Sequence, residues 1–182
     1  LDFSFPMLLV ARRLLSEQVD GNVHLVCADA ANLPFKDGSV DGVWSVQMLQ
    51  HLPRGRLDRC LDRIAQVKQT EAAVEVYWIN WSMLDRALLR LLGKRWPKER
   101  TEPYYFNMAT PHELLHLLHR SFRGRVSIAY NELIFHPELR LAHRWPLGWL
   151  DRALGALPGV NHWMARQLVG RVLPGGTTPG LE

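Results

Sequence analysis

The sequence contains few of the features that mark specialised classes of protein. Only two of its 182 residues are cysteines, Cys27 and Cys60, and their positions match neither a disulfide framework nor a metal-ligand spacing. Both are interpreted as small core residues in a reducing compartment. No apolar run is long enough to span a membrane, and no signal peptide is visible. These absences argue against a disulfide-stabilised or membrane-spanning protein and predict a cytoplasmic one.

Concentrated charge is also lacking. The net charge is +4, and the arginines are scattered along helix-like segments. A nucleic-acid-binding surface usually shows a basic block with interleaved aromatic residues, and none occurs here. The composition therefore does not favour a nucleic-acid partner. With 47% apolar residues over 182 positions, the chain is expected to form one domain with a sizeable core.

Two β-prone runs in the sequence are each followed by polar residues. Val23–Ala28 is apolar and stops at Asp29, and Gly42–Val46 follows the turn residues Lys36–Ser39. In an open parallel sheet, ligands bind beyond the carboxyl ends of the strands. We therefore expect Asp29 and the segment Ser45–His51 to lie at a ligand-binding edge.

The remaining elements follow from periodicity and capping residues. A helix is expected after Ser4, with Met7, Leu8, Ala11, Leu14 and Leu15 as its buried stripe. A second amphipathic helix follows Pro53 and ends in a turn at Lys68–Glu71, and a strand is expected at Ala73–Asn80. Further along we expect a helix from Ser82 to Leu92, a capped helix from Thr110, a strand at Arg125–Ile134, a helical stripe of Leu147, Leu150, Leu154 and Leu157, and either a helix or a final strand near Gln167–Val172.

The segment Cys27–Ser45, CADAANLPFKDGSVDGVWS, closely resembles a signature of small class I S-adenosylmethionine-dependent methyltransferases. Leu1–Leu8, LDFSFPML, is similar to that family's segment between its second strand and the next helix. The resemblance is good from Leu1 to about Asn80 and thin from Thr110 to Tyr130. It implies an α/β fold with a doubly wound, mostly parallel, Rossmann-like sheet.

The resemblance also implies cofactor contacts. Asp2 matches the acidic residue that receives the ribose hydroxyls, and Phe3 would lie against the adenine ring. Asp29 and the backbone N–H of Ala30 match the pair that reads adenine. The ordinary alternatives are a turn-capping role for Asp2, core packing for Phe3 and an Asx-turn at Asp29.

Ser45, Gln47 and His51 would lie on the cofactor and substrate side of the family's fourth strand. His51 is the candidate general base, since an imidazole can take a proton near neutral pH. The alternative is a hydrogen bond at a helix entry, because methyl transfer to a nucleophilic atom needs mainly alignment.

In this family, a glycine-rich loop that holds the methionine end of the cofactor precedes Leu1. No glycine cluster occurs here before Gly21. We therefore expect an N-terminally truncated methyltransferase, without its first strand and glycine-rich loop. Residues 1–134 would be a partial core, 135–173 an extension over the substrate side, and 174–182 a flexible tail.

Two further groups of residues lie outside the signature. His112, His116 and His119 have helical spacing, which suits either a metal site or a polar stripe, and the family has no metal here. We predict no metal. The aromatic residues outside the signature would either line an apolar acceptor pocket or close a local core; they are Trp96, Tyr104, Tyr105, Phe106, Trp145, Trp149 and Trp163.

The resemblance implies transfer of a methyl group from S-adenosylmethionine to a small molecule. A non-catalytic relative that acts through protein or membrane-surface contacts is the main alternative. A nicotinamide-dependent oxidoreductase would share the acidic residue after a strand, but Asp29–Ser39 disfavours it. A third alternative to methyl transfer is an interaction module built on the Leu- and Trp-rich residues 135–182.

Overall fold

The computed structural model describes residues 1–16, 22–81, 87, 90–91, 93, 98–101, 105–131, 153, 159–160, 165 and 167–174. The predicted helix from Ser82 lies largely outside these residues. The predicted leucine stripe near residues 147–157 and most of the C-terminal tail also lie outside them.

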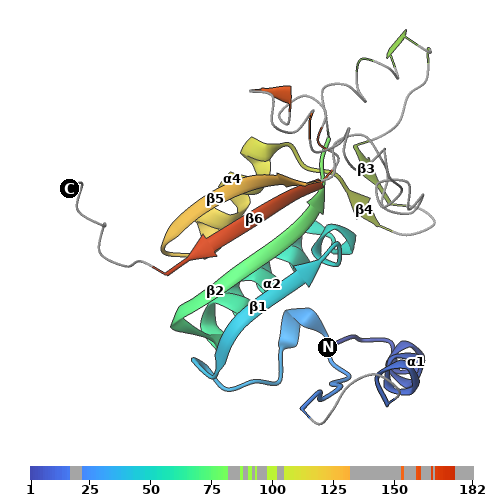
Figure 1. Ribbon diagram of the computed structural model, residues 1–182, viewed down its shortest axis with the longest axis vertical. Coiled ribbons are helices and arrows are strands. Elements are labelled where there is room, and N and C mark those ends of the chain that lie inside the picture. The colour runs from blue at the N-terminus through green and yellow to red at the C-terminus, as the bar shows by residue number, and fades with distance from the viewer. Residues whose placement is uncertain are drawn as a thin grey trace.

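A four-stranded sheet forms the centre of the described fold (Figure 1). Its order is β1 (Val40–Val46), β2 (Lys68–Ile79), β6 (Gln167–Leu173) and β5 (Arg125–Asn131). β1 and β2 are parallel, whereas β6 runs antiparallel to both of its neighbours. The final strand near Gln167 is thus confirmed over the alternative helix, and it lies in the middle of the sheet.

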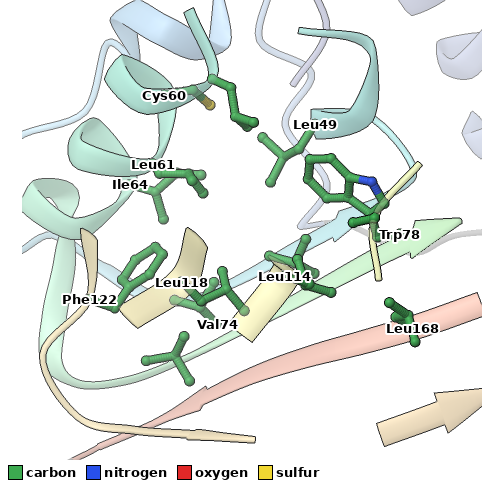
Figure 2. Packing of buried hydrophobic residues seen from close by; sticks show 14 residues of the cluster. Leu49, Cys60, Leu61, Ile64, Val74, Trp78, Leu114, Leu118, Phe122 and Leu168 are labelled. Carbon is green, nitrogen blue, oxygen red and sulfur yellow. The ribbon is translucent and has the colours of Figure 1, made fainter. Parts of the chain in front are cut away.

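Helices α2 (Arg54–Val67) and α4 (Pro111–Ser121) cover one face of this sheet (Figure 1). β2 alternates strictly there: Val74, Val76 and Trp78 are buried at 1% exposure or less. Figure 2 shows this cluster, in which the helices contribute Leu57, Cys60, Leu61, Ile64, Leu114 and Leu118 and β6 contributes Leu168 and Val172.

Gly170 on β6 lets α4 approach the sheet closely. A Cβ atom at this position would clash with the side chain of Leu118, which is fully buried. A strand glycine often marks such a close approach. The leucine face of α4 therefore packs directly on the backbone of β6.

Local signals in the sequence correctly located α2 and α4. Thr110 Oγ1 accepts a hydrogen bond from the Glu113 N–H, the Glu113 carboxylate accepts from the Thr110 N–H, and Pro111 occupies the first turn. The predicted turn at Lys68–Glu71 is wrong. The Lys68 N–H still bonds the Ile64 carbonyl, and β2 begins at Lys68 itself because this segment pairs with β1.

The N-terminal segment differs more from expectation. Helix α1 (Phe5–Ser16) forms as predicted, but Leu8 is its only buried apolar residue, whereas Met7 and Leu14 are 59% and 58% exposed. The predicted strand at Val23–Ala28 is reduced to one parallel bridge between Asp2 and Cys27, and Cys27 is exposed instead of buried. A buried stripe needs a partner surface, and little of the described sheet lies against α1 (Figure 1).

Short elements complete the described fold. The 3-10 helix η1 (Ala30–Asn32) precedes β1, and η2 (Leu49–His51) follows it. The pair β3 (Glu99–Arg100) and β4 (Phe106–Asn107) lies beyond the carboxyl end of β2, and Asn80 bridges to Ala109. Among the described residues, no helix is both long and apolar enough to cross a bilayer.

Candidate functional site

Asp2 and Asp29 lie at the carboxyl ends of two adjacent, parallel chain segments. The Asp2 N–H donates to the Val26 carbonyl at 3.1 Å, and the Ala28 N–H donates to the Asp2 carbonyl at 3.0 Å. Both segments then turn away, into α1 and η1. The structure thus brings together two carboxylates that are 27 positions apart, at one edge.

The Asp2 side chain has a local role in this geometry. Its Oδ1 accepts a hydrogen bond from the Ser4 N–H at 2.8 Å, at the entry to α1. This is the capping contact expected as the ordinary alternative, and it uses one carboxylate oxygen. Phe3 is 82% exposed, so the core-packing alternative for this ring is wrong.

Asp29 is held at both of its oxygens. Oδ1 accepts from the Ala31 N–H at 3.1 Å, which caps η1, and Oδ2 pairs with the Arg56 guanidinium at 2.6 Å. A carboxylate has about four lone-pair positions, so both oxygens can still accept further hydrogen bonds. The Asx-turn is therefore real and compatible with ligand recognition. Ala30 is the first residue of η1.

Arg56 was not identified from the sequence. It lies on the first turn of α2, and its ion pair joins Asp29 to this helix, which follows β1 and η2 in the chain. Burial, and to a lesser degree the Asp29 charge, raises the pKa of the Cys60 thiol beneath to about 12. The Arg56–Asp29 contact joins residues 27 positions apart, and a contact over that separation produces no periodic pattern in the sequence.

Ser45 and Gln47 carry two unusual features at the end of β1. Ser45 is 8% exposed, and its Oγ has no hydrogen-bond partner among the described residues. Gln47 is the single described non-glycine residue with a positive φ, at 53°, and its N–H donates to the Tyr77 carbonyl at 3.0 Å. Unsatisfied polar atoms and left-handed backbone both concentrate at functional sites.

His51 is anchored across the site. Its Nδ1 lies 3.1 Å from the Tyr105 carbonyl, and its ring lies 5.5 Å from that of Phe106. A carbonyl can only accept, so Nδ1 carries the proton and Nε2 is the basic nitrogen. This contact joins His51 to a residue 54 positions away.

Two buried amides, not identified from the sequence, fix the same edge. Gln50 is 1% exposed, and its Oε1 accepts from the Ile79 N–H at 3.0 Å. Asn80 is 2% exposed and donates from Nδ2 to the Ala165 carbonyl at 2.6 Å, while its Oδ1 has no partner among the described residues. In the sequence, only the positions of Gln50 and Asn80 close to expected strand ends indicated that they could belong to the site.

The histidines of α4 lie apart from these residues and line a cavity between α4, α2 and the segment that contains β3 and β4. The rings of His112 and His116 meet edge to face with centroids 4.4 Å apart. Within the described part of the chain, no group of three or more His, Cys, Asp or Glu side chains is arranged to hold a metal ion.

Comparison with known proteins was made for both sequence and fold. Residues 1–71 match the family model described as a methyltransferase domain. No curated protein matches the chain. Among solved structures, a possible histamine N-methyltransferase from Thermotoga maritima has a TM-score of 0.61 and 18% identity, with 94% of this chain and 70% of that chain covered.

Two other solved structures show how widely this fold is used. Phosphoethanolamine N-methyltransferase 2 of Haemonchus contortus, in complex with phosphomonomethylethanolamine and S-adenosylhomocysteine, has a TM-score of 0.54 and 14% identity, covering 96% of this chain and 43% of that chain. The [4+2]-cyclase SpnF has a TM-score of 0.60 and 19% identity, covering 96% and 64%. These likenesses establish a Rossmann-like methyltransferase fold, and the cyclase shows that the fold alone does not fix the reaction.

Proposed function

We propose that this chain is a class I S-adenosylmethionine-dependent methyltransferase, on its match to the methyltransferase-domain model over residues 1–71 and on its fold, and that its acceptor is a small molecule. The observation that carries the site assignment is the parallel bridge between Asp2 and Cys27. This bridge brings Asp2 and Asp29 to the carboxyl ends of two adjacent parallel segments, and we assign this edge, together with the end of β1, to the cofactor. This is where open α/β sheets bind their ligands.

We assign the adenosine half of the cofactor to this edge. Asp2 would accept the two ribose hydroxyls, and Phe3, which is exposed, would lie against adenine. The remaining lone pairs of Asp29 would accept the adenine amine, and the Ala30 N–H would donate to a ring nitrogen. Ser45, with its buried hydroxyl, and Gln47 would face the same ligand.

When bound, the cofactor would supply an electrophilic methyl group on its sulfonium. An acceptor nitrogen, oxygen or carbon would take this methyl group, and the C–S electron pair would stay on the sulfur of the departing S-adenosylhomocysteine. The protein then needs to align the acceptor and to receive one proton. His51 is our candidate for the proton, because its Nδ1–H is committed to Tyr105 and Nε2 is basic.

Calorimetric titration with S-adenosylhomocysteine tests the cofactor site. Asp29→Asn should lower the affinity about ten-fold or more, a loss of about 1.4 kcal/mol. Asp37→Asn is the matched control, because Asp37 pairs with Arg63 on the same helix at the same 2.6 Å and has no place in the proposed site. Equal affinities for the two variants would overturn the assignment of Asp29. No binding by the folded wild-type chain, nor by the same chain extended with whatever the gene encodes upstream of Leu1, would favour the non-catalytic alternative.

The pH dependence of turnover tests His51. If the imidazole takes the proton, His51→Gln should lower kcat about 100-fold and remove the acidic limb of the pH–rate profile. An unchanged profile with a modest rise in KM would mean that His51 only positions the acceptor.

The size class of the acceptor is tested by product analysis. The chain is incubated with methyl-labelled cofactor and a cell extract, and the products are separated into low-mass and macromolecular fractions. Label should enter the low-mass fraction and be lost in the Asp29→Asn variant. Label that enters protein or nucleic acid instead would overturn the small-molecule acceptor.

A further inference from the structure

A second cavity lies between α2, α4 and the segment that contains β3 and β4. Its volume is about 730 Å³, and none of Asp2, Asp29, Ser45, Gln47 and His51 lines it. Its size falls within the usual range for small-molecule sites. The proposed methyl transfer gives it no role.

The floor of this cavity is apolar. Leu57, Trp78 and Met108 line it and are 4%, 1% and 7% exposed. Trp78 also anchors the core shown in Figure 2, and its Nε1–H donates to the Asn107 carbonyl at 2.9 Å. With that donor committed, the indole offers a ligand only apolar contact.

The two acids that line the cavity are already engaged. Glu113 receives hydrogen bonds from Thr110 and pairs with Lys98. Burial raises the pKa of Glu113, but these partners outweigh burial and the pKa lies below its ordinary value. Glu99 accepts the Tyr105 hydroxyl at 2.8 Å. Neither carboxylate is therefore well placed to recruit a cation.

The cations are less fully engaged than the acids. Arg120 pairs with Asp58, but no carboxylate of the described residues lies within ion-pair distance of Arg54. The charge of Arg54 lowers the pKa of Tyr105, against the larger effects of burial and Glu99 that raise it to about 12. Arg54 therefore faces into the cavity, where His112 and His116 add two further N–H donors.

We propose that this cavity binds a small organic oxyanion, a carboxylate or phosphate monoester with an apolar body. Arg54 and the histidine pair contact its oxygens, and the half-buried side chains of Tyr105 and Leu117, backed by Leu57 and Trp78, contact its apolar body. A planar guanidinium forms paired hydrogen bonds with such groups. The site is separate from the cofactor edge, so the inference goes beyond methyl transfer itself.

A probe series of equal size tests the chemistry by calorimetry. Phenyl phosphate and benzoate should bind, and benzyl alcohol and benzylamine should bind at least about ten-fold more weakly. The stronger of the two anions identifies the headgroup. Inorganic phosphate should also bind about ten-fold more weakly than phenyl phosphate, because it lacks the part that contacts the floor. Benzylamine binding as tightly as the anions, or inorganic phosphate matching phenyl phosphate, would overturn the proposal.

Two variants locate the site. Arg54→Gln should weaken the binding of the better anion about ten-fold. Arg59→Gln is the matched control, because Arg59 is exposed on the same helix, donates to the Gly55 carbonyl and does not line the cavity. His116→Asn should weaken binding to an intermediate extent. Unchanged binding by Arg54→Gln would overturn the assignment.

A competition experiment separates this proposal from the cofactor site. Saturating phenyl phosphate should leave the affinity for S-adenosylhomocysteine unchanged, and Asp29→Asn should leave the affinity for phenyl phosphate unchanged. Displacement of S-adenosylhomocysteine would place the anion at the cofactor edge and overturn the second site, whatever the outcome for methyl transfer.

Discussion

Cys60 on α2 and Cys27 near the N-terminus illustrate two different regions of the molecule. Cys60 is fully buried beneath the sheet, whereas Cys27 is exposed and its thiol donates to the Phe3 carbonyl at 3.6 Å. The leucines differ in the same way: Leu118 is 0% exposed and Leu14 is 58% exposed. Apolar packing holds one region together. Hydrogen bonds and ion pairs, together with the packing of Ala30, Ala31 and Leu33 against the core cluster, connect the other region to it.

Those polar connections lie along α2. Arg56 pairs with Asp29, while Arg63 donates to the Leu33 and Phe35 carbonyls and pairs with Asp37. Asp29, the central residue of the proposed cofactor site, therefore lies outside the packed core. If the proposed cofactor site is right, the residues that stabilise the core and those that bind the ligand lie in different parts of the chain.

Thiol labelling should show the largest difference between the two regions. At pH 8 a water-soluble disulfide reagent should react with Cys27 at least about 1,000-fold faster than with Cys60, since reaching a core thiol requires opening that costs on the order of 5 kcal/mol. The pKa of Cys60, about 12, also keeps its thiol protonated. Cys27→Ser and Cys60→Ser assign the two phases, and similar rates would contradict the division.

Matched truncations of leucine should show the next largest effect. Leu118→Ala should cost about 3 kcal/mol of unfolding free energy, because it leaves a cavity between α4 and β6. Leu14→Ala should cost less than about 0.5 kcal/mol. Denaturant unfolding measures both, and a comparable loss at Leu14 would mean that α1 is packed in solution.

Gln47 tests the junction between the packed sheet and the proposed site. Gln47→Val should destabilise the fold by about 1–2 kcal/mol, because a β-branched residue is strained at a φ of 53°. Gln47→Gly should be neutral or slightly stabilising. Denaturant midpoints of the two variants give the comparison, and equal stabilities would argue against a left-handed backbone at this residue.

Glu113 should show the smallest effect, although it lies on the packed side. Its pKa is lowered on folding, so the carboxylate contributes stability above pH 4.5 that is lost as the pH falls through the lower folded value. Glu113→Gln keeps a capping-box side chain and removes the charge. Its stability should be a few tenths of a kcal/mol lower at pH 7 and should converge with the wild type near pH 3. A gap that persists at pH 3 would contradict a charge effect.

Features encoded by neighbouring residues were predictable. The Thr110–Glu113 capping box and the apolar period of α2 lie within a few positions of one another, and both helices formed where expected. The prediction that an extended segment ends at Asp29 was also correct, because the β-prone run stops there. The sequence could not show whether Leu14 has a partner surface, and its predicted burial was wrong.

Contacts between distant residues were not predictable. The Arg56–Asp29 pair, the Gln50 contact to Ile79 and the His51 contact to Tyr105 join residues 27 to 54 positions apart. Each depends on how whole elements dock, which composition and periodicity do not encode. The second cavity was not predictable for the same reason, because α2, α4 and β4 each contribute only part of its wall.

The central position of β6 has a consequence for the order in which the chain can fold during synthesis. β2 and β5 flank β6 and do not pair with each other, so the sheet stays open until Gln167–Leu173 has been synthesised. Until then, Leu114 and Leu118 lack the backbone of Gly170 against which they pack. Because such distant pairing is slow, a nascent chain would expose an apolar strand edge for the time needed to translate about half of the protein. We therefore expect the exposure of this edge during synthesis to depend on where in the sequence this one strand is encoded.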